Sequence, residues 1–122
     1  MKKYILITGA YGGMGKATAK ALKDRGFRIL ALDKSVGTEE DDIIPIEADI
    51  TDENSIRNAF EKIYGMTDEL FAIIHFAGIY MLNSLVEIEY AEFEKIFRIN
   101  LGGVYLINRT FLPLLKSDSR IG

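Results

Sequence analysis

The residues with the clearest chemical potential form a glycine-rich loop near the start of the chain. The segment Thr8–Gly15, TGAYGGMG, lies between an apolar run and an amphipathic segment. Glycines let a backbone turn tightly and approach a pyrophosphate, and the unpaired N–H groups at a helix N-terminus attract that anion. The loop therefore predicts a phosphate-binding turn between a strand and a helix. Its candidate binding residues are Gly9, Tyr11, Gly12, Gly13, Met14 and Gly15.

A carboxylate follows the loop at a distance that has its own meaning. Asp33 ends the second apolar run, 18 residues after Gly15. A carboxylate about 20 residues beyond such a loop can hydrogen-bond the ribose diol of a dinucleotide, and it repels a 2′-phosphate. The loop carries no basic side chain before Lys16, although Lys34 adjoins Asp33. We therefore predict NAD as the cofactor in preference to NADP.

Short apolar runs alternate with amphipathic segments along the chain, as in a βαβ protein. The predicted strands are 4–7, 27–32, 43–48 and 71–76, and the predicted helices are 15–25, 52–64 and 90–115. Thr51 is expected to cap the second helix and Gly65 to end it. Pro45 removes a backbone donor, so the third strand is expected at an edge of the sheet. The alternation predicts one α/β domain with a parallel sheet and helices on both faces.

Composition excludes several classes of function. The 122 residues are 27% charged and 48% apolar, with a net charge of −3, which gives no electrostatic signal for nucleic acid. Without cysteine, and with His75 as the single histidine, no disulfide, thiol nucleophile or ordinary zinc site is expected. The longest uncharged segment, 70–86, is interrupted by polar residues and is shorter than the roughly 20 residues of a membrane span. We expect no metal and no membrane contact, and a cytoplasmic protein.

The loop, Asp33 and three further motifs resemble the short-chain dehydrogenase/reductase family. Thr8–Gly15 is similar to its TGxxxGxG motif, and Asp33 takes the position of its ribose-binding acidic residue. Asp49-Ile50 is similar to the family segment whose aspartate holds the adenine amino group. The segment His75-Phe76-Ala77-Gly78 stands where the family has NNAG, beside the cofactor. Asn100 is similar to the asparagine of the family's catalytic tetrad. Phe76 departs from the family, because it replaces an asparagine that helps knit the central sheet together.

This resemblance implies a Rossmann-type doubly wound sheet with strand order 3-2-1-4 and an NAD(P)-binding domain over residues 1–122. It implies an oxidoreductase that transfers hydride between nicotinamide and a secondary alcohol or ketone. To the glycine loop and Asp33 it adds cofactor-binding residues, namely Asp49, Ile50, Phe76, Ala77 and Gly78. Asn100 is the one catalytic residue that it places in this chain, where it would hold a water of the proton relay.

The remaining catalytic residues of the family are a serine and a Tyr-x-x-x-Lys pair, which follow a fifth strand. This chain has no tyrosine with lysine four residues later, and the nearest pair, Tyr105 with Arg109, is interpreted as structural. The sequence reaches Gly122 where the fifth strand would begin, so we expect the N-terminal half of such an enzyme, inactive by itself. Strand 71–76 would then be an exposed edge, and we expect self-association or a homo-oligomer through that strand and the long helix.

Two alternative interpretations remain. The pair Gly12-Gly13 also fits the TGxxGxxG motif of the family's extended branch, and His75 is similar to the histidine of that branch. That alternative is an epimerase or dehydratase with resident NAD. The segment from Asn100 to Pro113-Leu114-Leu115 resembles the compact branch instead, which we favour. The second alternative is a non-catalytic dinucleotide-binding module.

Overall fold

In the computed structural model, which describes residues 2–78, 87 and 89–122, a five-stranded parallel sheet forms the centre of the chain. Its strands are β1 (Tyr4–Thr8), β2 (Arg28–Asp33), β3 (Ile43–Glu47), β4 (Leu70–His75) and β5 (Leu115–Ile121). They lie in the order β3-β2-β1-β4-β5, with every neighbouring pair parallel. The predicted α/β fold is confirmed, and β3, which contains Pro45, lies at an edge as expected.

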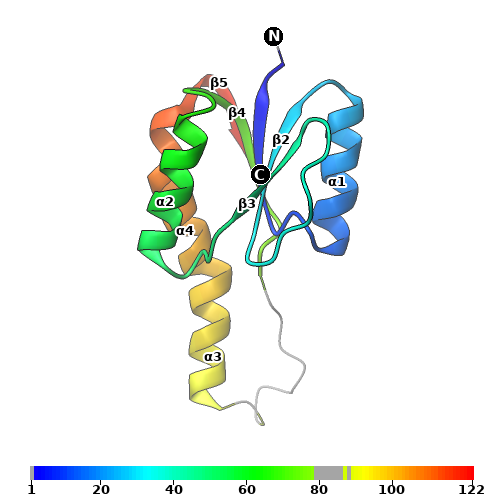
Figure 1. Cartoon of the computed structure of the whole chain (residues 1–122). Coiled ribbons are helices and arrows are strands. Elements are labelled where there is room, and N and C mark those ends of the chain that lie inside the picture. The colour runs from blue at the N-terminus through cyan, green and yellow to red at the C-terminus, as the bar shows by residue number, and fades with distance from the viewer. Residues whose placement is uncertain (1, 79–86, 88) are drawn as a thin grey trace.

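Helices cover both faces of the sheet. The α-helices of the described residues are α1 (Gly13–Asp24), α2 (Glu53–Tyr64), α3 (Tyr90–Phe97) and α4 (Gly103–Phe111). Figure 1 shows α1 on one side of the sheet and α2 and α4 on the other, while α3 extends beyond the body of the domain. The doubly wound arrangement is therefore confirmed. Among the described helices, none combines the length and the apolar character needed to cross a membrane.

The long helix predicted over 90–115 is not continuous. Between α3 and α4 the chain makes a π-helical turn, Arg98–Gly102, and after α4 a 3-10 turn, Leu112–Leu114. Pro113 lies in that 3-10 turn, and because proline has no backbone N–H the α-helical ladder ends before it. The prediction was therefore right about the helical character of the segment and wrong about its regularity and its last residue.

The cap of α2 also differs from the prediction. Asp52, not Thr51, is the N-cap, since its carboxylate accepts hydrogen bonds from the backbone N–H groups of Asn54 (2.9 Å) and Ser55 (3.4 Å). Thr51 is engaged elsewhere, with both its hydroxyl and its N–H donating to Asp49. A helix needs one acceptor at its N-cap, and the sequence offers two adjacent candidates for it.

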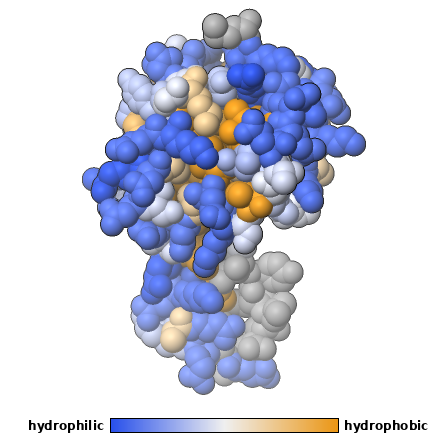
Figure 2. All heavy atoms as spheres, in the orientation of Figure 1, coloured by the Kyte–Doolittle hydropathy of each residue, from blue (hydrophilic) through white to orange (hydrophobic). Residues whose placement is uncertain are grey.

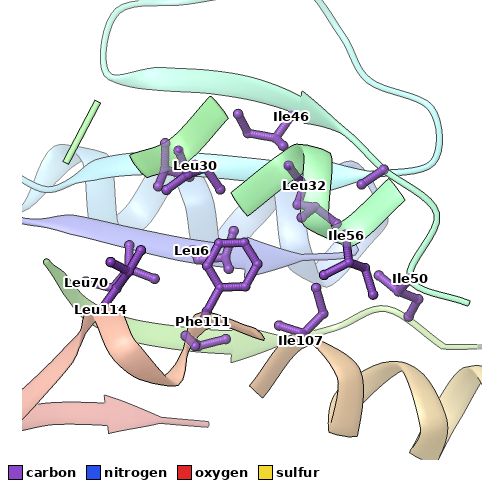
Figure 3. Packing of buried hydrophobic residues seen from close by; sticks show 14 residues of the cluster. Leu6, Leu30, Leu32, Ile46, Ile50, Ile56, Leu70, Ile107, Phe111 and Leu114 are labelled. Carbon is purple, nitrogen blue, oxygen red and sulfur yellow. The ribbon is translucent and has the colours of Figure 1, made fainter. Parts of the chain in front are cut away.

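Alternate residues of the central strands face two separate cores. On one face Phe111 and Ile107 of α4 and Ile56 of α2 pack over Leu6 and other apolar side chains of the sheet (Figure 3). The opposite face packs against α1 through a second cluster that includes Ile5, Ile7, Ala19, Ile29 and Ala31. This division follows from the period of two along a strand, which sends successive side chains to opposite faces. The face drawn in Figure 2 is largely hydrophilic, with a few hydrophobic side chains at its centre.

The sheet extends one strand further than predicted. The backbone N–H of Gly122 donates to the Ile73 carbonyl (2.7 Å), and that of His75 donates to the Gly122 carbonyl (2.7 Å). The expectation that the sheet stops at β4 was therefore wrong, and so was the expectation of an exposed β4 edge. The physical reason is that an unpaired edge of a buried strand leaves N–H and C=O groups without partners, and residues 120–122 satisfy them. Self-association through the long helix stays a prediction.

The pairing of β5 with β4 contains a bulge. Leu115 pairs with Leu70, but the next pair is Arg120 with Ala72, so residues 116–119 loop out between them. Ser119 closes the bulge, because its hydroxyl oxygen accepts from the Lys116 N–H (2.8 Å) and donates to the Leu70 carbonyl (2.7 Å). The first residues of β5 therefore pair irregularly with β4, and regular pairing starts at Arg120.

Candidate functional site

A cleft of about 430 Å³ lies where the central strands end. The glycine loop after β1, the ends of β2 and β3, the loop after β4 and the α3 region all contribute to it. Its lining residues are Gly9, Gly12, Leu32, Asp33, Lys34, Ala48, Asp49, Ile50, Thr51, Phe76, Ala77, Gly78, Lys95, Arg98 and Ile99. Five segments that are distant in sequence thus meet at the carboxyl edge of a parallel sheet, the edge at which α/β proteins bind ligands.

Two glycines of the loop are required by close approaches. Gly9 has a φ of +67°, and a Cβ added there would lie 2.5 Å from the backbone nitrogen of Ala77. A Cβ on Gly15 would lie 2.1 Å from the carbonyl oxygen of Gly9. The loop after β1 is therefore packed backbone to backbone against both α1 and the loop after β4, with no space for a side chain.

The N-terminus of α1 borders the cleft with backbone amides that no side chain in the described part of the chain caps. Gly12 is its N-cap and offers no side-chain hydrogen bond, and the first helical bond runs from the Lys16 N–H to the Gly12 carbonyl (2.9 Å). The N–H groups of the first helical turn therefore receive no side-chain cap. A Cβ on Gly13 would meet no atom within 4 Å, so this turn is open on its outer side. Such a helix end suits an anion.

The Asp33 carboxylate is held by the backbone on both sides. Its Oδ2 accepts from the Tyr11 N–H (3.0 Å) and its Oδ1 from the Lys34 N–H (2.8 Å). Each carboxylate oxygen can accept a further hydrogen bond, so both remain able to bind a hydroxyl in the cleft. The two backbone bonds fix the direction in which the charge points.

Asp49 provides a second carboxylate on the same cleft. Its Oδ1 accepts from the Thr51 hydroxyl (2.6 Å) and the Thr51 N–H (2.9 Å). These bonds, and to a smaller extent the positive charge of Lys34, hold the pKa of Asp49 below its ordinary value against the opposing effect of burial. Asp49 is therefore an ionised acceptor, suited to a ligand that donates N–H groups.

His75 faces away from the cleft, although its three successors line it. Its Nδ1 lies 3.3 Å from the Thr8 hydroxyl and its Nε2 lies 2.8 Å from Oδ1 of Asn108 on α4. The Thr8 hydroxyl in turn accepts from the Ala77 N–H (3.4 Å). Phe76 stands where the family's sheet-knitting asparagine was expected, and the structure shows that the preceding residue, His75, links β1, β4 and α4 instead.

Asn100 lies in the π-helical turn and not in the lining of the cleft. Its Oδ1 would lie 2.9 Å from a Cβ added to Gly78, so the asparagine packs directly on the loop after β4. Behind it, a Cβ on Gly103 would lie 2.4 Å from Cδ1 of Ile50. Asn100 therefore sits next to the predicted cofactor segment, where Gly78 leaves room for it.

Most predicted cofactor residues meet in the cleft, and a few do not. Tyr11, Gly13, Met14 and Gly15 are absent from its lining, although Tyr11 contributes its N–H to Asp33. Lys34, noted from the sequence beside Asp33, also lines the cleft, and the lining residues that sequence reasoning missed are Leu32, Ala48, Thr51, Lys95, Arg98 and Ile99. Residues 95, 98 and 99 share one helical face by spacing, a signal that becomes useful only once the direction of α3 is known.

Comparisons with known proteins give one consistent result. A family model described as short chain dehydrogenase matches residues 3–122. An uncharacterized oxidoreductase of Thermotoga maritima is 29% identical over 120 residues, covering 88% of this chain and 46% of the relative. The chain thus spans about half the length of that relative.

Solved structures agree in fold. A 3-ketoacyl-(acyl-carrier-protein) reductase from Brucella melitensis, complexed with NADH, is 26% identical with a TM-score of 0.82, and the match covers 92% of this chain and 50% of that one. A variant of ElxO with NADPH bound is 25% identical with a TM-score of 0.83, with the same two coverages of 92% and 50%. Both nicotinamide cofactors therefore occur among proteins of this similarity.

Proposed function

This chain belongs to the short-chain dehydrogenase family, and on that premise we propose that its cleft binds the adenosine and pyrophosphate parts of NAD. One observation carries the proposal. The glycine loop, Asp33 and Asp49, which are far apart in sequence, line the same cleft at the carboxyl edge of the sheet. A dinucleotide needs an anion site, a ribose acceptor and a base site side by side, and this cleft supplies acceptors and amides in that combination.

The residues fit the proposed ligand in chemical type. The uncapped amides at the start of α1 suit the pyrophosphate, and the fixed Asp33 carboxylate suits the 2′- and 3′-hydroxyls of the adenosine ribose. Asp49, kept ionised by Thr51, suits an adenine amino group, and Ile50 and Ile99 supply apolar surface for the ring. Bound NAD would supply the hydride acceptor, and these side chains would bind and orient it.

The charge at the ribose position supports NAD over NADP. Asp33 cannot turn its carboxylate away without breaking two backbone hydrogen bonds, so a 2′-phosphate would meet a fixed negative charge. Lys34 also lines the cleft and weakens this repulsion without removing it, because its ammonium is carried on a long flexible chain.

For the whole protein we propose hydride transfer between nicotinamide and a secondary alcohol or ketone. Asn100, packed on Gly78 beside the cleft, is the residue of this chain that would take part in the proton relay. The serine and the Tyr-x-x-x-Lys pair of the family would come from beyond Gly122. The substrate class rests on the family and not on a feature of this cleft.

Cofactor binding is tested by titrating the chain with NADH and with NADPH and following nicotinamide fluorescence or heat. NADH is expected to bind more tightly. Replacing Asp33 with serine removes the fixed negative charge and should reduce that preference by about tenfold, which corresponds to about 1.4 kcal/mol. Asp68→Asn removes an exposed carboxylate that does not line the cleft and serves as the matched control. Tighter binding of NADPH than NADH, or no binding of either, would contradict the proposal.

Catalysis is tested by reading the coding sequence past the codon for Gly122. A serine followed by Tyr-x-x-x-Lys, together with alcohol-dependent reduction of NAD by the purified protein, supports the dehydrogenase. A stop codon directly after Gly122 leaves the other candidate, a non-catalytic dinucleotide-binding module.

A further inference from the structure

Tyr11 belongs to the glycine loop, but its side chain points away from the cleft and into the protein. The ring packs beside the hydrophobic cluster between the sheet and α1, and a Cβ added to Gly37 would lie 3.0 Å from its Cε1. At the same residue, the backbone N–H donates to the Asp33 carboxylate (3.0 Å). Tyr11 therefore contacts both Asp33 and the segment that follows it.

The Tyr11 hydroxyl has no evident polar function. It is buried beside the Gly37 backbone and makes no hydrogen bond of good geometry with any residue in the described part of the chain. Burial raises the pKa of the phenol, the Gly37 backbone lowers it, and the negative charges of Glu40 and Asp33 raise it further. The ring, which packs on the hydrophobic cluster and beside Gly37, is therefore the part of Tyr11 that can support the neighbouring segment.

The segment that the ring touches connects β2 to β3 without a helix or a regular strand of its own. Its far end is anchored, because Asp42 forms ion pairs with Lys2 and with Arg28 (3.2 Å). Its near end begins at Asp33 and Lys34, which line the cleft. Between these ends, the contact of Tyr11 with Gly37 is where the segment packs against the glycine loop.

We propose that Tyr11 is a positioning residue that sets the preference for NAD over NADP, by holding residues 34–37 so that Asp33 keeps its carboxylate on the ribose side of the cleft. The inference rests on the proposed binding of NAD in that cleft. Without the ring, the segment loses its central support, Asp33 gains freedom to rotate, and Lys34 gains freedom to approach a 2′-phosphate. Loss of the ring thus weakens NADH binding and relieves the penalty against NADPH at the same time.

The test compares dissociation constants for NADH and NADPH in three variants of the full chain, with thermal melts of each. In Tyr11→Ala the ratio of the NADPH to the NADH constant should fall by about tenfold, the factor that corresponds to about 1.4 kcal/mol. Tyr11→Phe keeps the ring and should keep the ratio. Leu22→Ala is the matched control, because Leu22 lies on α1 and packs on the same hydrophobic cluster from there. It should lower the melting temperature and leave the ratio unchanged.

Each outcome decides something. An unchanged ratio in a folded Tyr11→Ala protein, or a fall of equal size in Leu22→Ala, would overturn the inference. If Tyr11→Ala does not fold, Gly37→Ala probes the same contact from the other side, since its methyl group would press on the ring. A lowered ratio there supports the inference and an unchanged one rejects it. If the unaltered chain binds neither nucleotide, the proposed function itself has failed, which is a different result from binding with an unaltered ratio.

Discussion

Nε2 of His75 lies 2.8 Å from Oδ1 of Asn108, and this contact joins the end of β4 to α4. On the other side of the ring, Nδ1 lies 3.3 Å from the Thr8 hydroxyl at the end of β1. A neutral imidazole has one donor and one acceptor nitrogen. Because an amide oxygen can only accept, the hydrogen-bond partners assign a hydrogen to Nε2, and in that tautomer the Thr8 hydroxyl donates to Nδ1. The hydrogen-bond network assigns this tautomer, and it leaves the Thr8 oxygen able to accept from the Ala77 N–H.

This network predicts that two asparagines contribute differently to the free energy of unfolding. Asn108→Ala should lower the free energy of unfolding by about 1–2 kcal/mol, because the partly buried Nε2–H loses its acceptor. Asn58→Ala, at an exposed position of α2, should change it by less than about 0.5 kcal/mol. Urea denaturation of both variants checks the difference. Equal effects would mean that the contact contributes nothing to stability.

The glycines of the loop predict a second contrast. Gly9→Ala should destabilise the chain by about 3 kcal/mol or more, because the new methyl group would overlap the backbone of the loop after β4 and the φ of +67° is unfavourable for alanine. Gly13→Ala makes the same chemical change in the first turn of α1, where a Cβ meets nothing within 4 Å, and should be neutral or slightly stabilising. Thermal melts of the two variants distinguish these cases, and similar melting temperatures would contradict the packing described for Gly9.

The lowered pKa of Asp49 predicts a pH-dependent contribution to stability. Because the folded pKa lies below the ordinary carboxyl value, the stabilisation is fully present above that ordinary value and is lost as the pH falls through the folded pKa. Thr51→Val removes the hydrogen bond from the Thr51 hydroxyl to Asp49 and should lower the free energy of unfolding by about 1 kcal/mol at neutral pH. The cost should fade in acid, once Asp49 is protonated.

Thr67→Val is the control for that experiment. The Thr67 hydroxyl bonds to the backbone of Glu69, donating to its carbonyl (3.0 Å) and accepting from its N–H (3.2 Å). Neither partner titrates, so the cost of this substitution should be the same at neutral and acid pH. Unfolding free energies measured across that range give the comparison, and a cost of Thr51→Val that does not change with pH would argue against an ionised Asp49 as the acceptor.

How much the sequence predicted depends on whether the signal was local. The glycine loop and Asp33 could be predicted from the sequence, because a strand, a turn and a helix fix their relative positions over a short stretch of chain. Lys95 and Arg98 reach the same cleft from the α3 region, and nothing in their spacing states where that helix points. Binding residues contributed by one motif were therefore predictable, and those brought in by tertiary packing were not.

The fifth strand was missed for a related reason. Its sequence, LKSDSRI, is polar, and its attachment to β4 uses backbone groups and one serine hydroxyl instead of buried side chains. Hydrophobic periodicity detects strands that bury side chains, and it does not detect a strand that is held by backbone hydrogen bonds. The cap at Asp52 shows the same limit at smaller scale, since Thr51 and Asp52 are equivalent candidates until Asp49 is seen to engage Thr51.

The bulge in β5 provides the last prediction, because it places one hydroxyl at the point where the strand becomes regular. Ser119→Ala leaves the buried Leu70 carbonyl and the Lys116 N–H without their partner, and should cost about 1 kcal/mol. The loss should be local, so the amide of Gly122, which donates to Ile73, should exchange with solvent faster than in the unaltered chain. Ser117→Ala removes an exposed hydroxyl two residues earlier and should leave that exchange rate unchanged. Equal exchange in the two variants would show that β5 is held by its backbone alone and that Ser119 has no part in ordering it.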